Sequence, residues 1–347
     1  MYMKKLRFLG FLAVMMYGYF GCNSKTDQAM GNQDTWRIIV VEQGAGKVSI
    51  LDPVSGTTER SVDVGYNPHE IALRPDGKTA YVTNFGIEDY DHTIGTPGTD
   101  IAVIDLSAMK IVTALLTNSS PAQKDNQAPH GVKLRPQREE ELFVNVEVGD
   151  SMLVYDLPTG KIKRSFSLPA GAHNFLFSPN GDTIFLFAGS LGVFSIDPDS
   201  GAQLDHLPTA TAIRGLHYTN DGRYLIVSGI NEIYLVNPAD LSVDRHFTDL
   251  GVKQIIYSSP TPDEQSILAP CPYDNLVLLV DLESGEVKKR IATGKAPIYV
   301  QIAPSGKEAI VANALDTFMS SIDLEDYSVR SIGELNRPNG FAFIAGL

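Results

Sequence analysis

The sequence predicts an all-β fold, a seven-bladed β-propeller whose blades are four-stranded antiparallel sheets. Three observations predict it: short alternating strands recur without helical periodicity, one strand-and-turn pattern returns every 40 to 53 residues, and seven copies of it span the chain. A period of about 40–45 residues with four strands is typical of one propeller blade. The length of 347 residues would also allow two domains, so it is the repeat that favours a single ring.

The first repeated pattern is a short apolar strand that ends in Asp or Asn and runs into a turn. An Asp or Asn side chain accepts hydrogen bonds from the backbone two residues on and so closes a tight turn. Turn-forming residues follow, as in 53–56 and 198–201. The seven strands end at Asp52, Asp105, Asp156, Asp197, Asn237, Asp281 and Asp323.

The second pattern lies between copies of the first and is an apolar strand, a turn and another apolar strand. Its clearest copy is 68–84, where Pro75-Asp-Gly-Lys78 forms the turn. Further copies of this pattern are recognised at 129–136, 175–181, 216–222 and 297–313. Together the two patterns supply four strands per repeat, which predicts complete blades.

The two ends of the repeat array predict how the ring closes. The first repeat, 36–65, lacks an innermost strand, and residues 337–344 match that missing strand with no outer strands after them. We therefore expect the C-terminal strand to complete the first blade, which removes an exposed sheet edge.

The N-terminal residues predict export and anchoring. Lys4, Lys5 and Arg7 precede an uncharged run over 8–21, which is shorter than the ~20 residues of a membrane span. Gly21-Cys22 resembles a bacterial lipobox, which implies lipidation of Cys22 and an outer-membrane lipoprotein facing the periplasm or the exterior. The expected organisation is a signal peptide over 1–21, a lipidated tether over 22–35 and the propeller over 36–347. The alternative is plain secretion with an unmodified Cys22.

Charge and composition narrow the classes of partner. Loss of the three basic leader residues takes the formal charge from −13 to −16, which argues against nucleic acid as a partner. With 43% hydrophobic and 20% charged residues the chain can bury a large core, and we expect a monomer. Cys271 has no cysteine or evident base beside it in the sequence and is expected to be a packed thiol.

Polar residues recur where the inner strands begin, which is the end that forms the functional top face of a propeller. Three interpretations stay open: a hydrated channel lining, a ligand site for an anionic or polar group, and a metal held by His69, His130 and His173, since imidazoles suit zinc or copper. The residues at the seven strand starts are His69, His130, His173, Arg214, Lys253, Ile298 and Asn339. A polar ring is expected behind them at the ends of the second strands, formed by Glu42, Asn84, Asn145, Ser228 and Asn313.

Two long irregular segments, 85–100 and 117–128, belong to the second repeat and should project from the top face beside His69 and His130. Long loops on a rigid scaffold often carry function. They are interpreted as a lid or partner contact in which Tyr90 and Asp91 meet a ligand, with Tyr299 stacking on it; the alternative is a tolerated insertion. The acidic run 139–141 is expected to be a solvated turn.

Tyr81-Val-Thr-Asn84, after the turn at 75–78, resembles the YVTN-type repeat of seven-bladed propellers. That family includes lactonase-like enzymes, surface proteins and ligand-capturing lipoproteins. The resemblance implies a lipid-anchored propeller that captures a small cobalamin-, siderophore- or other chelate-like ligand on its top face and passes it to an outer-membrane transporter, with no required cofactor.

Two alternatives to capture stay open. One is a lactonase-like hydrolase that uses His69 or His130 as base and Arg214 for the oxyanion. The other is a structural, protein-binding propeller. The sequence contains no Gly-x-Ser-x-Gly, His-Glu-x-x-His or Cys-x-x-Cys motif, which favours binding over catalysis.

Overall fold

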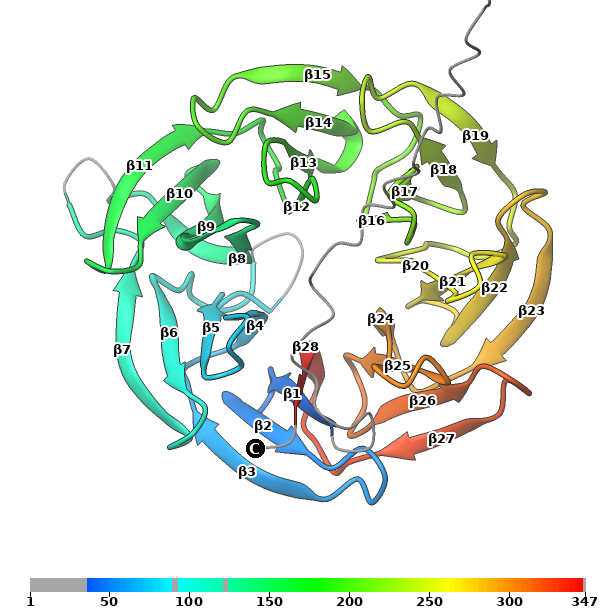
Figure 1. The fold of residues 1–347 in the computed structure, drawn as a ribbon, viewed down its shortest axis with the longest axis horizontal. Coiled ribbons are helices and arrows are strands. Elements are labelled where there is room, and N and C mark those ends of the chain that lie inside the picture. Colours follow the sequence, from blue (N-terminus) through cyan, green and yellow to red (C-terminus); the bar gives the residue numbers. More distant parts are fainter. Residues whose placement is uncertain (1–35, 89–92, 121–123, 346–347) are drawn as a thin grey trace, which may run out of the picture. The chain divides into compact units, whose positions relative to one another are not determined.

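The computed structural model describes residues 36–88, 93–120 and 124–345, which form seven four-stranded antiparallel sheets arranged in a ring (Figure 1). The predicted seven-bladed propeller is confirmed. The expected signal peptide and tether lie outside the described residues. No helix of the described residues has the length and apolar character needed to cross a bilayer.

The blades follow the chain in order, each with its innermost strand first. Blade 1 contains β28 (Pro338–Ala345), β1 (Trp36–Glu42), β2 (Lys47–Leu51) and β3 (Thr58–Asp63). Blade 2 contains β4 (Pro68–Leu73), β5 (Thr79–Asn84), β6 (Asp100–Asp105) and β7 (Lys110–Leu116). Blade 3 contains β8 (Gln127–Arg135), β9 (Arg138–Val148), β10 (Ser151–Asp156) and β11 (Lys161–Ser167).

The remaining four blades repeat this plan. Blade 4 contains β12 (Asn174–Phe177), β13 (Ile184–Phe187), β14 (Val193–Ile196) and β15 (Gln203–Leu207), with a 3₁₀ turn η2 at Gly189–Leu191. Blade 5 contains β16 (Gly215–Tyr218), β17 (Leu225–Ser228), β18 (Ile233–Val236) and β19 (Val243–Phe247). Blade 6 contains β20 (Ser259–Pro260), β21 (Ser266–Cys271), β22 (Leu276–Asp281) and β23 (Val287–Ala292). Blade 7 contains β24 (Pro297–Ile302), β25 (Glu308–Asn313), β26 (Met319–Asp323) and β27 (Val329–Ile332).

The ring closes as the sequence predicts, because β28 pairs with β1. The antiparallel register runs from Trp36 opposite Ala345 to Glu42 opposite Pro338. Gly340 of β28 allows a close approach to blade 2: a Cβ there would lie 2.7 Å from the carbonyl oxygen of His69. The C-terminal strand therefore completes blade 1 and also packs against the start of β4.

The expected Asp-closed turns are present between the third and fourth strands. Oδ1 of Asp52 accepts the N–H groups of Val54 and Ser55 at 3.0 and 2.8 Å. Oδ1 of Asp281 accepts those of Glu283 and Ser284 at 3.0 and 2.8 Å. The repeated side chain thus provides a repeated structural function, which is why it marks the blade period in the sequence.

The apolar core lies between neighbouring blades. Leu142 and Val144 of β9 in blade 3, for example, pack in one buried cluster with Tyr81 and Val103 of blade 2. Middle strands such as β9 and β10 are buried on both faces over most of their length, whereas an outer strand such as β11 alternates exposed and half-buried residues. Full burial of each such side chain contributes about 1.5–3 kcal/mol, so the packed interfaces hold the blades rigidly in place.

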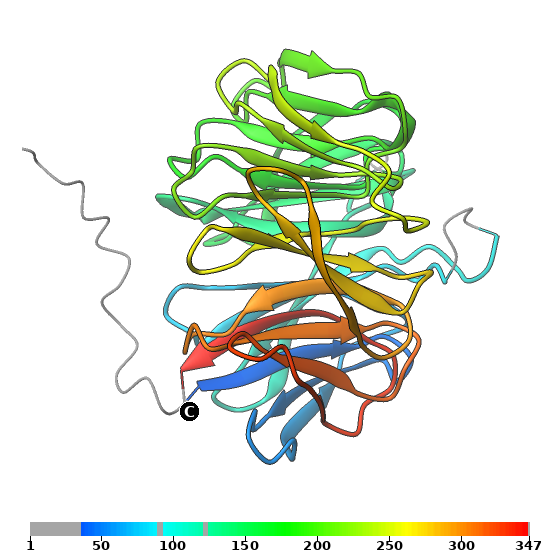
Figure 2. The same cartoon turned by 90° about the vertical axis from the view of Figure 1, so that its right-hand side faces the viewer.

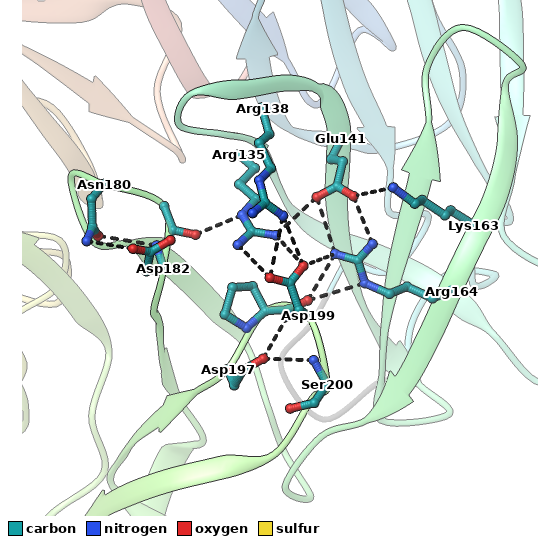
Figure 3. Close-up of polar contacts among 12 residues, drawn as sticks. Arg135, Arg138, Glu141, Lys163, Arg164, Asn180, Asp182, Asp197, Asp199 and Ser200 are labelled. Carbon is teal, nitrogen blue, oxygen red and sulfur yellow. Dashed lines mark hydrogen bonds and ion pairs between the residues drawn. The ribbon is translucent and has the colours of Figure 1, made fainter.

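An ion cluster centred on the buried side chains of Arg135 and Glu141 joins blades 3 and 4 (Figure 3). Arg135 donates to both carboxylate oxygens of Asp199 at 2.7 and 3.1 Å and to Glu141 at 3.2 Å. Glu141 also accepts from Lys163 and Arg164, at 2.8 and 2.9 Å. The expectation of a solvated turn is therefore wrong for Glu141, because β9 begins at Arg138 and its register turns this side chain towards three cations.

We call the side of the ring at which the inner strands begin the top face. Figure 2 shows the segments that flank residues 89–92 extending beyond the blades on this side. Gly98 donates its N–H to Phe85 at 2.9 Å, and Ala128 donates to Gly98 at 2.8 Å. The described parts of the two long segments thus contact each other on the top face, where the sequence places them.

Candidate metal centre at the top face

The backbone bulges at the start of inner strands β4 and β8. In blade 2, Pro68 lies opposite Asn84 and Ile71 lies opposite Val82, so two residues of β4 face one of β5. In blade 3 the same irregularity lies between Pro129 and Val132. Such bulges redirect side chains and are common beside functional sites. The bulged residues include His69, Glu70 and His130.

Polar side chains of the second strands hold these bulges. The N–H of Glu70 donates to the hydroxyl of Thr83 at 3.1 Å, and the N–H of Gly131 donates to Oδ1 of Asn145 at 2.9 Å. Asn145 also donates to the carbonyl of His173 at 3.0 Å. Asn145 therefore fixes the backbone beside His130 and that of His173 at once.

The three histidines predicted at the strand starts lie together in a row. The ring centroids of His69 and His130 are 4.2 Å apart, and those of His130 and His173 are 4.1 Å apart. The rings are tilted by 42° and 40°. Phe85, from the long segment of blade 2, packs edge-on against His69 and His130 at 5.3 and 5.1 Å.

Two glutamates complete the cluster. Oε1 of Glu147 lies 2.7 Å from Nδ1 of His173 and 3.9 Å from Nε2 of His130. Oε1 of Glu70 lies 4.0 Å from Nδ1 of His69. The potential ligand atoms form two sets that share His130, one with His69 and Glu70 and one with Glu147 and His173. Within each set the atoms lie within 4.8 Å of one another.

The central histidine is buried without satisfying its polar atoms. His130 is 0% exposed, and within the described part of the chain neither of its ring nitrogens has a hydrogen-bond partner. Nδ1 of His69 is also buried without one. An unsatisfied buried polar group costs about 1–3 kcal/mol, so such atoms call for an explanation.

Burial keeps these imidazoles neutral. It lowers the pKa of His69 to about 3, with the nearby His173 acting in the same direction. It lowers the pKa of His130 well below the ordinary value, again reinforced by His173. Burial also raises the pKa of the Glu70 carboxyl, although Lys133 and His173 oppose this. Neutral imidazoles have a lone pair available for a metal ion without loss of a proton.

Of the two basic residues predicted at strand starts, the structure places Arg214 where it was expected and Lys253 elsewhere. Arg214 directly precedes β16, as expected, and is half-buried. Lys253 is exposed and lies six residues before β20, where its N–H bonds Asp274. The N–H of Ile256 donates to the carbonyl of Pro270 on the second strand, as the N–H of His173 and that of Arg214 donate to the second strands of their own blades. Ile256 therefore occupies the strand-start position that was predicted for Lys253.

The polar ring expected behind the strand starts is buried and bonded within the fold. Asn84 donates to the carbonyl of Val64 at 3.1 Å, and Ser228 shares a hydrogen bond with Ser258 at 2.8 Å. Asn313 donates to Phe318. The buried members are Glu42, Asn84, Asn145, Ser228 and Asn313. These side chains connect strands, as Asn145 does, and do not present an open ring.

Two further residues predicted to contact a ligand, Asn339 and Tyr299, make contacts within the fold. Asn339 is buried, and its amide donates to Gln43 at 3.0 Å, which supports ring closure. Tyr299 is half-buried and packs edge-on against Tyr257 at 5.4 Å. Tyr90 and Asp91 lie outside the described residues.

Sequence reasoning missed Glu70, Glu147 and Phe85. Glu70 could have been predicted from the sequence, because it follows His69 directly in a Pro-His-Glu segment. Glu147 was hidden because β9 continues past Asn145 to Val148, which places Glu147 two strand positions beyond Asn145. Residues two apart in a strand share a face, which is the signal that would have found Glu147.

No protein-family model and no curated protein matches this chain, so the resemblance of 75–84 to the YVTN-type repeat is not confirmed as family membership. Solved structures do match. Hydrazine synthase of Kuenenia stuttgartiensis is 18% identical with a TM-score of 0.71, over 85% of this chain and 94% of that one. A candidate 6-phosphogluconolactonase of Bacteroides uniformis is 15% identical with a TM-score of 0.69, over 90% and 100% of the two chains.

A third similar structure is the dihydro-heme d1 dehydrogenase NirN in complex with DHE. It is 15% identical with a TM-score of 0.63, over 91% of this chain and 76% of that one. At these identities the likeness shows the shared propeller fold. Function must therefore be argued from the site of this chain.

Proposed function

We propose that this protein is a metal-binding propeller that holds one divalent transition-metal ion at the top of the ring. The observation that carries the proposal is His130, a neutral and fully buried imidazole with two unsatisfied nitrogens between two carboxylates. Imidazole and carboxylate ligands suit zinc and neighbouring first-row metals.

The set formed by His130, Glu147 and His173 suits the ion best. Its three ligand groups come from two neighbouring blades, and Asn145 fixes the backbone of Gly131, next to His130, and that of His173 before the ion arrives. Nitrogen and oxygen ligands bind zinc at about 2.0–2.2 Å, so the side chains must move together slightly on binding. Three protein ligands leave a fourth position for water or a small ligand.

The enclosure of the cluster favours a small ligand. His69 and His173 are each 17% exposed and His130 is 0% exposed, so the cluster offers little surface to a large ligand and suits a bare ion or a small chelate. This narrows the expected cobalamin- or siderophore-like ligand to a metal ion or a small chelate. Lipidation of Cys22 and passage of cargo to an outer-membrane transporter remain parts of the proposal, tested by membrane partition of Cys22→Ser.

The test is metal stoichiometry and affinity in purified protein that has been stripped and reloaded with zinc, copper or cobalt. We expect one ion per chain and an increase in melting temperature, because ligand binding stabilises the native state. His130→Ala should weaken binding at least 100-fold. His246→Ala is the matched control, since His246 pairs with Glu232 at 2.7 Å on the outer strand of blade 5.

Absence of stoichiometric binding in the reloaded wild-type protein would overturn the proposal. Equal loss in His130→Ala and His246→Ala would also do so. Lactone turnover is measured in the same samples: turnover that disappears in His130→Ala while metal content stays unchanged would favour the hydrolase alternative.

A further inference from the structure

A cavity lined by residues at and near the innermost strands lies apart from the histidine cluster. It is a cavity of ≈ 270 Å³ lined by residues of blades 3 to 7. Its polar lining is formed by Lys133 of β8, Asn174 of β12, His217 of β16, Tyr257 just before β20, and Tyr299 of β24. We call it the Lys133 cavity.

A polar bridge lies beside this cavity and links it to the region of the histidines. Asn174 donates to Glu70 at 3.1 Å and to the hydroxyl of Tyr257 at 2.9 Å. His69, His130 and His173 do not line the cavity among the described residues. The Lys133 cavity is therefore a second site with its own chemistry.

Lys133 is the cation of the cavity. In the described part of the chain its ammonium makes no hydrogen bond or ion pair, and Nζ lies 5.9 Å from the centre of the Phe175 ring. Glu70 is near enough to interact with Lys133 electrostatically, but it does not line the cavity, and its burial raises its pKa. A half-buried ammonium without a paired anion favours a negatively charged ligand.

Two hydroxyl groups can add hydrogen bonds to the same anion. Burial raises the pKa of both Tyr257 and Tyr299, with Glu70 acting in the same direction, so both phenols stay protonated. The Tyr257 oxygen already accepts from Asn174, which leaves its proton free to donate. His217 bonds the carbonyl of Tyr218 through Nδ1, and burial lowers its pKa, so it adds no charge.

The remaining lining is apolar and selects a ligand whose body is apolar as well. It consists of Phe175, Leu176, Phe177, Phe187, Leu216 and the ring of Tyr218. The volume lies just below the ~300 Å³ at which pockets for drug-sized ligands begin. The space thus fits a small molecule with an apolar body and one charged end.

We propose that the Lys133 cavity binds a small monocarboxylate with an aromatic or branched aliphatic body. The carboxylate pairs with the Lys133 ammonium and accepts from the tyrosine hydroxyls, while the body packs on the phenylalanine and leucine side chains. This site is independent of the proposed metal ion.

The test is calorimetric titration of metal-stripped protein with benzoate and with 3-methylbutanoate. Both should bind, and the neutral analogue benzyl alcohol should bind at least tenfold more weakly. Lys133→Met should weaken benzoate binding at least tenfold, whereas Lys133→Arg should stay within threefold of wild type. Lys289→Met is the matched control, because Lys289 lies over the Tyr327 ring at 4.6 Å outside the cavity.

Three outcomes would overturn the inference: no benzoate binding by the wild type at 10 mM, equal binding by Lys133→Met, or equal loss in Lys289→Met. His130→Ala, which removes the proposed metal ligand, should keep benzoate binding. If His130→Ala loses benzoate binding while Lys133→Met keeps it, the anion binds at the histidines instead. Tyr299→Phe supplies a second variant if Lys133→Met fails to fold, with an expected loss of threefold or more.

Discussion

Oε1 of Glu147 lies 2.7 Å from Nδ1 of His173, and the two residues belong to different blades. The same oxygen lies 3.9 Å from Nε2 of His130. One carboxylate oxygen thus faces two imidazoles, and these three groups form one of the two potential ligand sets for a metal ion.

Glu147→Gln keeps the size of the side chain and removes its charge. We expect metal affinity to fall at least tenfold, because the ion loses its anionic ligand. Isothermal titration with zinc measures the change. Glu232→Gln, which alters the Glu232–His246 pair on blade 5, is the control and should bind metal normally. Unchanged affinity in Glu147→Gln would remove Glu147 from the site.

Gly340→Ala should destabilise the ring closure. The added Cβ would lie 2.7 Å from the His69 carbonyl oxygen and 3.1 Å from Cα of Glu70, so β28 and β4 must separate. Overpacking of this kind costs about 1–3 kcal/mol, measured as the free energy of unfolding in urea. Metal affinity should fall as well, because the His69 ring, which moves, packs against the proposed ligand His130 with ring centroids 4.2 Å apart.

The control for this variant is Gly77→Ala. A Cβ at Gly77 meets no atom within 4 Å, although its φ of +66° is strained for alanine. We expect Gly77→Ala to lower stability by about 1–2 kcal/mol, the cost of a left-handed backbone for alanine, and to leave metal affinity unchanged. A fall in metal affinity in both variants would show that general destabilisation, and not the contact with His69, is responsible.

Arg135→Met should unfold more easily than the wild type. Arg135 is 2% exposed, and its loss leaves Asp199 and the Gly181 carbonyl without its hydrogen bonds. Glu141 keeps Lys163 and Arg164, and the Asp199 side chain is 53% exposed, so the expected cost is that of the lost hydrogen bonds, about 1–3 kcal/mol. Arg330→Met is the matched control: Arg330 also spans two blades, through Glu308 and Pro53, but its side chain is 44% exposed. There the expected cost is about 0–1 kcal/mol.

The same cluster predicts that the stability of the fold falls at acid pH. Arg164 and Lys163 hold the pKa of Glu141 at about 2, against the opposing effect of burial. Because the folded-state pKa lies below the unfolded value of about 4.5, Glu141 stabilises the fold above pH 4.5. That stability is lost as the pH falls from 4.5 towards 2.

This loss amounts to about 3 kcal/mol and is measured by urea unfolding at a series of pH values. Glu141→Gln should lack this part of the acid response. An identical pH profile in Glu141→Gln and wild type would contradict the assignment.

The repeat made the architecture predictable from the sequence. Turn residues such as Asp52 and Asp281 act within a few residues of themselves, so their spacing reports the blades directly. The closing strand could be predicted for the same reason, because a blade without an inner strand and a strand without a blade complement each other. Position within a blade then placed His69, His130 and His173 correctly.

The sequence by itself determined the ring, its closure and the histidine-bearing positions, because these follow from local periodicity. Only the tertiary structure decided the chemistry of the centre. It brought Glu147 to His173 from another blade, placed Ile256 where Lys253 was expected, and buried Glu141 among cations. Contacts between blades depend on strand length, bulges and register, and a shift of one or two residues changes which side chains meet.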